Sequence, residues 1–179
     1  MIWILISILV IGTGVWLVML RMPGTSHSGA AAPLTQREVV MRDSLRRDVK
    51  KLAGEIGERN LIRYEGLTAA ARYLEQGLTE AGYNVERNDF EVSTPGGPSS
   101  TSNLIVELKG TQLPEESVIV GAHYDSREGT PGADDNASGS AAALSLARTF
   151  AKVKTGRTLR FGFFTNEEYF RQDRRGSLV

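Results

Sequence analysis

Three polar clusters contain the residue types that could carry out chemistry. The first is GAHYDS at residues 121–126, the second is GADDNASG at residues 132–139, and the third is TNEEYF at residues 165–170. Together they supply one imidazole and several carboxylates, but no thiol, because the chain has no cysteine. Nitrogen and oxygen donors of this kind suit zinc or a similar divalent ion. The clusters therefore predict a metal site.

The spacing within the first cluster favours a metal-binding histidine over a serine nucleophile. His123 and Asp125 are two residues apart, so both side chains lie on the same side if the strand continues. The carboxylate can then hold one ring nitrogen and direct the other toward a metal. Ser126 lacks the G-x-S-x-G turn that presents a hydrolase serine, and the histidine is too close to its supposed partner for a Ser-His-Asp triad.

Each cluster taken alone also has a simpler interpretation. A lone histidine after a strand is usually structural. Asp134 and Asp135 could be no more than caps before a helix, where Asn136 and Ser138 can also bind N–H groups. The two glutamates of the third cluster could be a solvated edge. The order of all three clusters along the chain favours the metal site instead.

Alternating strands and helices are expected to position these clusters. Strands are predicted at residues 84–92, 103–109, 117–122 and 158–165. Helices are predicted at residues 35–56, 67–81 and 138–152. A Pro/Gly/Ser stretch at residues 94–102 is expected to be a turn.

This pattern predicts an α/β fold, in the form of a three-layer sandwich with a mixed, largely parallel sheet. Two of the clusters follow strands, and the other begins a connecting helix, which places all three at the rim where α/β proteins bind ligands. The strand at residues 158–165 is expected to lack later neighbours and to form an apolar edge.

The beginning of the chain predicts one transmembrane helix. Residues 2–20 contain only Ser7 and Thr13 as polar side chains, and a helix over this run would reach about 28 Å. A cleaved signal peptide is the alternative, since residues 30–32 offer a small-residue cleavage site. We favour an uncleaved anchor because the apolar run is long for a signal peptide and no Lys or Arg precedes it.

Charge and architecture give opposite answers about the side of the membrane. Arg21, Arg37 and Arg42 follow the span, which by the positive-inside rule places the body of the chain in the cytoplasm. The signal-like architecture places it outside. We expect a single-pass membrane protein, attached through residues 2–20, whose catalytic domain is extracytoplasmic.

The overall charge balance argues against a nucleic-acid partner. Lys and Arg number 21 and Asp and Glu also number 21, so the formal net charge is zero. A nucleic-acid-binding domain would normally show a basic excess. Only two histidines are present, and His27 lies in a small, polar linker where nothing would fix it as a metal ligand.

The ordered combination of motifs resembles the two-zinc aminopeptidases, whose wider relatives include carboxypeptidases and glutaminyl cyclases. The resemblance covers roughly residues 61–168: TAAARYLEQGLTEAGYNVERNDFEV, SNLIVELKG, GAHYDS, GADDNASG and FFTNEE. It implies release of the N-terminal residue from a peptide substrate, whose free amine is recognised near two zinc ions.

The resemblance also implies a role for each matching residue. His123 would ligate one zinc, and Asp125 would orient its imidazole. Asp135 would bridge both zinc ions. Glu167 would be the general base, and Glu168 would ligate the second zinc. The chain would then comprise an anchor or signal segment at 1–21, a linker at 22–34, and the N-terminal portion of a zinc peptidase-like domain at 35–179.

The sequence departs from the family pattern after the glutamate pair. The family needs a later Asp and a later His, but Asp173 comes too soon and no histidine follows His123. Each zinc would have two protein ligands, whereas catalytic zinc sites usually have three. We therefore expect a truncated, inactive N-terminal part of an aminopeptidase-like enzyme. The alternatives are a catalytically dead domain that binds a peptide or partner, and a glutaminyl cyclase-like transferase.

Overall fold

The computed structural model describes residues 2–20, 24, 28–94 and 96–168 of the chain. They form two compact units, Met1–Pro33 and Leu34–Val179, which are described separately. His27 and Asp173 lie outside the described residues.

The first unit consists of one apolar helix. It is formed by α1 (Ile2–Val15) and a short π-helical continuation, η1 (Trp16–Leu20). The stretch Ile2–Met19 has a mean hydropathy of 2.5 and none of it is buried. By length and composition it can cross a membrane, although a signal sequence would show the same properties.

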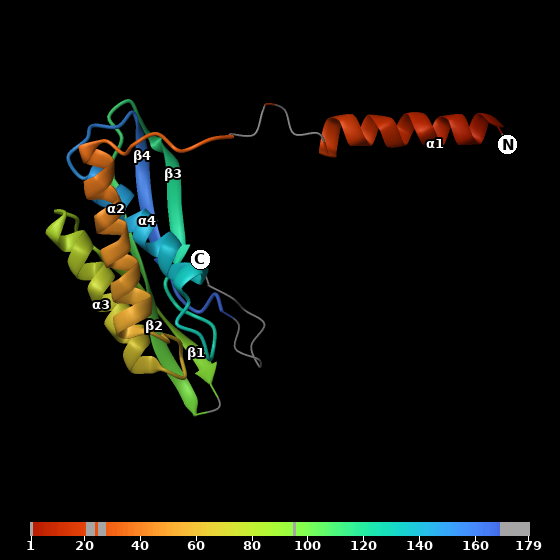
Figure 1. The fold of residues 1–179 in the computed structure, drawn as a ribbon. Helices are drawn as coiled ribbons and strands as arrows, with labels where there is room; N and C mark the ends of the chain where they lie inside the picture. The colour runs from red at the N-terminus through yellow and green to blue at the C-terminus, as the bar shows by residue number, and fades with distance from the viewer. Residues whose placement is uncertain (1, 21–23, 25–27, 95, 169–179) are drawn as a thin grey trace. The chain divides into compact units, whose positions relative to one another are not determined.

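A mixed, four-stranded sheet is the framework of the second unit (Figure 1). Its strands are β1 (Glu86–Thr94), β2 (Gly97–Leu108), β3 (Leu113–His123) and β4 (Arg157–Phe164). They are arranged in the order β1-β2-β4-β3. The β1/β2 and β2/β4 pairs are antiparallel, and the β3/β4 pair is parallel. The α/β class and the mixed sheet are therefore confirmed.

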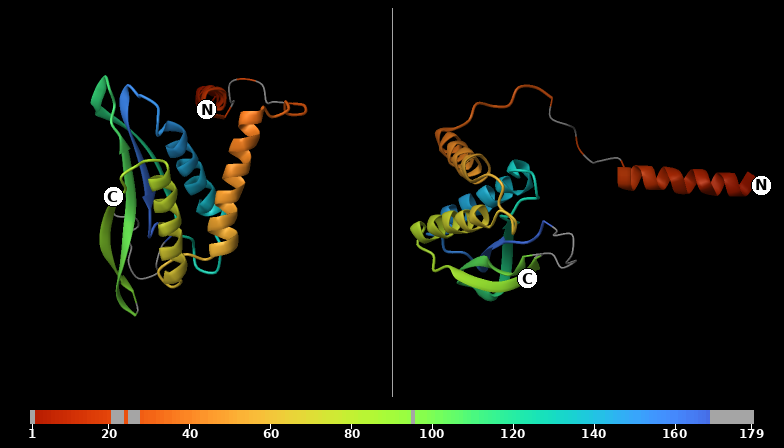
Figure 2. Two further views of the ribbon diagram at one scale, coloured as in Figure 1. Left: turned by 90° about the vertical axis from the view of Figure 1, so that its left-hand side faces the viewer. Right: turned by 90° about the horizontal axis from the view of Figure 1, so that it is seen from below.

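Helices cover one face of this sheet in the described part of the chain (Figure 2). They are α2 (Gln36–Val49), its continuation η2 (Lys50–Ile56), α3 (Tyr64–Glu80), η3 (Ala133–Ser138) and α4 (Gly139–Phe150). α3 and α4 contact the sheet, and α2 packs on α4. Of the three layers expected for the sandwich, the described residues thus provide the sheet and the helices on one side.

Helix boundaries follow signals that are visible in the sequence. The α2 helix begins with a capping box, in which the Thr35 hydroxyl accepts the Glu38 N–H and the Glu38 carboxylate accepts the Thr35 N–H. The α3 helix is followed by Gly82, whose φ of 97° lies in the left-handed region that glycine adopts readily. The predicted helices at 35–56, 67–81 and 138–152 are confirmed within a few residues.

The hydrophobic core lies between the helices and the sheet. The helices contribute buried side chains such as Leu74 and Leu144, which are fully buried, as are Phe161 and Phe163 of β4. These aromatic residues alternate with outward-facing ones, because successive side chains of a strand point to opposite faces. The sheet is thereby fixed against α3 and α4 on its helix-covered face.

Three expectations about the sheet are corrected. The sheet is not largely parallel among the described strands, because two of its three pairings are antiparallel. Residues 97–102 are not a turn but the first half of β2, because their backbone pairs in register with β1. The strand at 158–165 is not an edge, because β4 lies between β2 and β3.

Among the described strands, the sheet ends at β1 on one side and at β3 on the other, and β3 has a hydrogen-bonded neighbour on one side only. Its Val118 and Ile119 side chains are 45% and 66% exposed. Unpaired N–H and C=O groups beside apolar side chains promote association with other strands. We therefore expect Ile119→Lys to reduce self-association of the chain severalfold, as measured by sedimentation velocity in nonionic detergent.

A matched control is Val40→Lys, because Val40 is 62% exposed but lies on α2. This variant should associate as the wild type does. Equal behaviour of the two lysine variants would show that the open edge does not drive association.

Candidate metal centre

The parallel β3/β4 pair brings two of the three polar clusters to one edge of the sheet. His123 is aligned with Phe164, so the strands end side by side and their following residues meet. Directly after β4, Asn166 has a φ of 60°, in the left-handed region that asparagine tolerates better than most residues. This bend precedes Glu167 and Glu168. The expectation that the clusters meet at the carboxyl ends of the strands is confirmed.

The His123 imidazole lies at the middle of the cluster. Its Nε2 is 2.9 Å from Asp135 Oδ1 and 3.8 Å from Glu167 Oε2. On the other side of the ring, Nδ1 is 3.3 Å from Asp125 Oδ1. All five residues singled out from the sequence thus surround this ring, the fifth being Glu168, which is described next.

Asp125 connects the two strand ends. Its side chain is 2% exposed, and its second oxygen, Oδ2, accepts a hydrogen bond of 3.0 Å from the Glu168 N–H. Asp125 therefore contacts the imidazole through one oxygen and the glutamate segment through the other. Such a carboxylate fixes the orientation of both groups.

Three side chains are close enough to share one cation. Ligand atoms of His123, Glu167 and Glu168 all lie within 4.8 Å of one another. Asp135 Oδ1 adds a further oxygen beside the imidazole. One imidazole nitrogen with carboxylate oxygens is a donor set that zinc accepts. The residues present therefore fit a zinc ion.

Asp135 reaches the cluster from η3, in the loop before α4. Asp135 and Asn136 have non-helical backbone angles, and the peptide bond between them is cis. Asn136 Oδ1 accepts the Gly139 N–H at 2.9 Å, as its predicted capping role requires. Ser138 does not cap: its hydroxyl donates to the Asp134 carbonyl one turn back, because the serine already lies within helical backbone.

A pair of glycines leaves space for an aromatic ring beside the histidine. Gly121 of β3 and Gly162 of β4 are aligned across the two strands. A Cβ atom at either position would lie 2.7 Å or 2.6 Å from the Phe164 ring. The ring therefore occupies the open face of the sheet next to the strand ends, and side chains at these positions would displace it.

Ser126, the serine of the first polar cluster, is unavailable as a nucleophile. Ser126 is fully buried, its Oγ donates to the Thr130 carbonyl at 2.9 Å, and it accepts the Arg59 N–H at 3.1 Å. This agrees with the rejection of a Ser-His-Asp triad.

Ser140, which the sequence did not single out, donates from Oγ to the His123 carbonyl at 2.8 Å and holds the strand end against α4.

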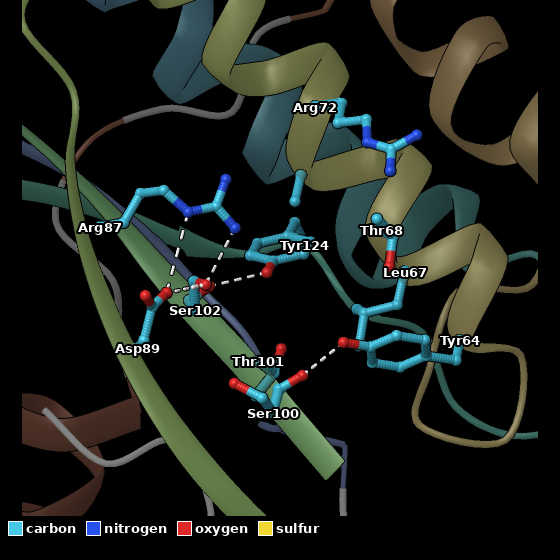
Figure 3. Close-up of a pocket in the computed structure, with 11 residues that line it drawn as sticks. Tyr64, Leu67, Thr68, Arg72, Arg87, Asp89, Ser100, Thr101, Ser102 and Tyr124 are labelled. Carbon is cyan, nitrogen blue, oxygen red and sulfur yellow. Dashed lines mark hydrogen bonds and ion pairs between the residues drawn. The ribbon is translucent and has the colours of Figure 1, made fainter.

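A separate polar cavity lies between α3 and the β1–β2 hairpin (Figure 3). Its volume is about 380 Å³, and Arg72, Arg87 and Asp89 are among its lining residues. Tyr124 also lines it and donates from its hydroxyl to the Ser102 carbonyl at 2.7 Å. None of the five clustered residues lines this cavity, so it is not part of the candidate metal centre.

The crowded carboxylates shift the proton affinities of the cluster. Burial by itself lowers the pKa of His123, but the hydrogen bonds and charges of Asp125, Asp135 and Glu167 outweigh it and raise the pKa to about 9. Burial, followed by repulsion from Asp135 and Glu167, raises the pKa of the Glu168 carboxyl. In the metal-free chain at neutral pH, the ring is therefore an imidazolium held by carboxylates.

This shift predicts that His123 stabilises the metal-free chain below neutral pH and loses that effect in alkali. Because its pKa is about 9 in the folded chain and near 6.5 otherwise, the stabilisation is complete below pH 6.5 and disappears as the pH rises through 9. The test compares urea unfolding of the wild type and His123→Gln in nonionic detergent at several pH values. A stability difference that does not shrink between pH 6 and pH 10 would contradict it.

Comparison with known proteins shows which proteins this chain is similar to. Residues 103–177 match the family model described as peptidase family M28. A probable zinc metalloprotease of Pyrenophora teres f. teres is 32% identical over 154 residues, which are 72% of this chain and 33% of that protein. Residues 103–177 are therefore similar to the peptidases of family M28. The resemblance to zinc exopeptidases is thereby confirmed, and zinc is the metal that such relatives are named for.

Solved structures show the same fold as the M28-related unit. The glutaminyl cyclase of Porphyromonas gingivalis is 26% identical, with a TM-score of 0.63 over 74% of this chain and 48% of that one. A leucine aminopeptidase precursor from Bacteroides thetaiotaomicron is 25% identical, with a TM-score of 0.60 over 75% of this chain and 50% of that one. The chain spans about a third to a half of the length of the first curated relatives that it matches.

One buried residue at this site was missed from the sequence. Arg59 is fully buried next to the cluster, and its side chain contacts backbone carbonyls. No spacing rule marks such a residue, because its partners are groups that every amino acid carries. In the sequence, Arg59 is only a charged residue in the loop between two predicted helices, which is too common a feature to be informative.

Proposed function

We propose that this chain supplies the first part of the active site of a zinc-dependent aminopeptidase, which hydrolyses the N-terminal bond of a peptide. The observation that carries this proposal is the convergence on His123 Nε2 of carboxylates from two other segments, Asp135 and Glu167. Relatives named as zinc metalloproteases support the same chemistry.

Each clustered side chain has a chemical role in this proposal. Zinc, when bound, supplies a Lewis acid that polarises the scissile carbonyl. His123 and Glu168 would hold metal, and Asp125 Oδ1 would accept the Nδ1 proton of His123, leaving Nε2 free to ligate. Glu167 is 56% exposed, so its carboxylate can accept a proton at the site and return it to the leaving amine.

The proposal includes two zinc ions, both of which Asp135 would help to hold. Asp135 is 71% exposed and lies on the side of His123 that faces away from Asp125. His123 with Asp135 would serve one ion, and Glu168 with Asp135 the other. With these residues alone, each ion would be held by two protein side chains. We expect no appreciable turnover by this chain alone, since catalytic zinc sites usually have three protein ligands.

The proposed setting is a membrane surface. The apolar helix Ile2–Met19 would anchor the chain, with the peptidase-like unit outside the cytoplasm, where it would meet peptide substrates rather than nucleic acids.

A glutaminyl cyclase-like transferase is the second candidate, favoured by the fold similarity to solved glutaminyl cyclases. The aminopeptidase-like site predicts two zinc ions per chain, and the cyclase-like site predicts one. A catalytically dead binding domain need not hold zinc stoichiometrically.

Zinc content tests the proposal directly. The full chain in nonionic detergent is dialysed against zinc, and the bound metal is measured for wild type, Glu168→Gln and Glu115→Gln. Glu115 is an exposed residue of β3 outside the cluster, so its variant should bind as the wild type does. Glu168→Gln should weaken binding at least about tenfold. Absence of zinc from the wild type, or equal binding by all three proteins, would overturn the proposed function.

Turnover of an aminoacyl anilide by the same samples tests the expected inactivity. We expect none above the rate of a metal-free control. Robust turnover that is lost in Glu167→Ala would show that this chain forms a complete catalytic site.

A further inference from the structure

Arg59 makes an unusual set of contacts for a fully buried cation. Every side-chain hydrogen bond recorded for it among the described residues ends at a backbone carbonyl oxygen. Its Nε donates to Tyr124 at 2.6 Å, Nη2 to Gly132 at 2.8 Å, and Nη1 to Gly57, Pro131 and Leu52. A planar guanidinium with five N–H groups can satisfy several carbonyls at fixed angles, which an ammonium group cannot.

The carbonyls bound by Arg59 belong to the segments that carry the candidate metal centre. Tyr124 lies between His123 and Asp125, at the end of β3. Gly132 directly precedes η3, which carries Asp135. One guanidinium therefore connects the strand end that presents the imidazole with the loop that presents the carboxylate.

Main-chain contacts strengthen this connection. The Arg59 N–H donates to Ser126 Oγ at 3.1 Å, and the Ser126 N–H donates to the Arg59 carbonyl at 2.8 Å. Gly132 has a φ of 52°, and a Cβ atom there would lie 2.4 Å from the Asp135 carbonyl oxygen. The loop is thus closely packed at the point where Arg59 holds it.

The charge of Arg59 is maintained despite its burial. Desolvation lowers the pKa of Arg59 to about 10, and the negative charge of Asp125 opposes the decrease. The guanidinium therefore stays protonated at neutral pH and keeps all its donors. Asp125 also contacts His123 and the Glu168 N–H. The charge of this one buried carboxylate therefore acts on both the Arg59 guanidinium and the clustered residues.

We propose that Arg59 is a positioning residue for the candidate metal centre: it fixes the loop that carries Asp135 relative to the strand end that carries His123. This inference rests on the proposed function for its consequence, which is zinc affinity. The restraint that Arg59 places on the loop at residues 129–139 does not depend on metal.

The test uses Arg59→Lys in the full chain, in nonionic detergent, with two measurements. In the metal-free protein, amide hydrogen exchange of residues 129–139 should increase at least about tenfold, because lysine cannot replace the separate donors. Zinc affinity, measured by competition with a chromophoric chelator, should fall by about 10- to 100-fold, as for other residues that orient ligands. Methylguanidinium should partly restore zinc affinity to Arg59→Ala.

Tyr73→Phe is the control for a general loss of stability. It removes the hydrogen bond of the Tyr73 hydroxyl to Asp48, among the helices, and leaves the Arg59 contacts in place. It should lower the melting temperature without changing loop exchange or zinc affinity. If Arg59→Lys resembles this control in both measurements, the inference is wrong.

Two other outcomes are also decisive. If the wild type binds no zinc, the proposed function fails, but hydrogen exchange still decides whether Arg59 restrains the loop. If Arg59→Lys does not fold, Ser126→Ala removes the hydroxyl that links the Arg59 N–H with the Thr130 carbonyl. Faster exchange of residues 129–139 in this milder variant supports the inference, and unchanged exchange overturns it.

Discussion

Replacement of His123 by alanine is expected to lower the zinc affinity of the chain by more than about 100-fold, the upper range for loss of a residue that merely orients a ligand. The reason is that His123 supplies the only nitrogen donor of the cluster among the described residues, and two carboxylates approach its Nε2. Without the ring, the carboxylates repel one another with nothing between them. Chelator competition at neutral pH measures the change.

A graded series makes this result specific. Asp125→Asn keeps the ring but weakens the contact that orients it, so affinity should fall by about 10- to 100-fold. His27→Ala removes the other histidine of the chain, for which we expect no metal role, and should bind zinc as the wild type does. If His123→Ala and His27→Ala bind zinc equally well, zinc is held elsewhere and the proposed site is wrong.

The second large effect is expected on stability, far from the metal ligands. Asp48 of α2 is fully buried, where its carboxylate pairs with Arg148 of α4 and accepts a hydrogen bond of 2.6 Å from the Tyr73 hydroxyl of α3. Asp48→Ala leaves a guanidinium and a phenol without their partner between three helices. We expect the free energy of unfolding to fall by about 3–5 kcal/mol, as when one member of a buried ion pair is removed.

Urea unfolding followed by circular dichroism measures this loss. Asp43→Ala is the matched control, because Asp43 lies on the same helix, is 57% exposed and pairs with Arg42 at the surface. Its variant should change the free energy of unfolding by no more than about 1 kcal/mol. A similarly small change in Asp48→Ala would show that the buried network does not hold the helices together.

Except for the first half of β2, the sequence predicts the strands and the meeting of the five clustered residues, for a physical reason. β4 is recognised from its apolar run, in which Phe161, Gly162 and Phe163 are all buried. Residues that follow such a strand must lie at its end. The sequence therefore predicts that His123 and Glu167 lie at the same rim of the sheet.

The order of the strands and the buried hydrogen bonds of Arg59 cannot be predicted in this way. The position of β4 between β2 and β3 depends on which pairing buries the most side chains. The alternation of side chains within one strand does not indicate which strand pairs with it. The 97–102 segment was misassigned because serine, glycine and proline are typical of turns, yet here they pair in register with β1. Arg59 was missed because it binds main-chain carbonyls, which leave no mark in a sequence.

The order of the strands also determines when the cluster can be assembled during synthesis of the chain. Among the described strands, β3 pairs with β4 and with no earlier strand, although β4 is made after it and after α4. A nascent chain that ends before Arg157 can form the β1–β2 hairpin but has no strand to hold β3. Until β4 inserts, His123 is on an unpaired segment, so the cluster is completed only after β4 has been made.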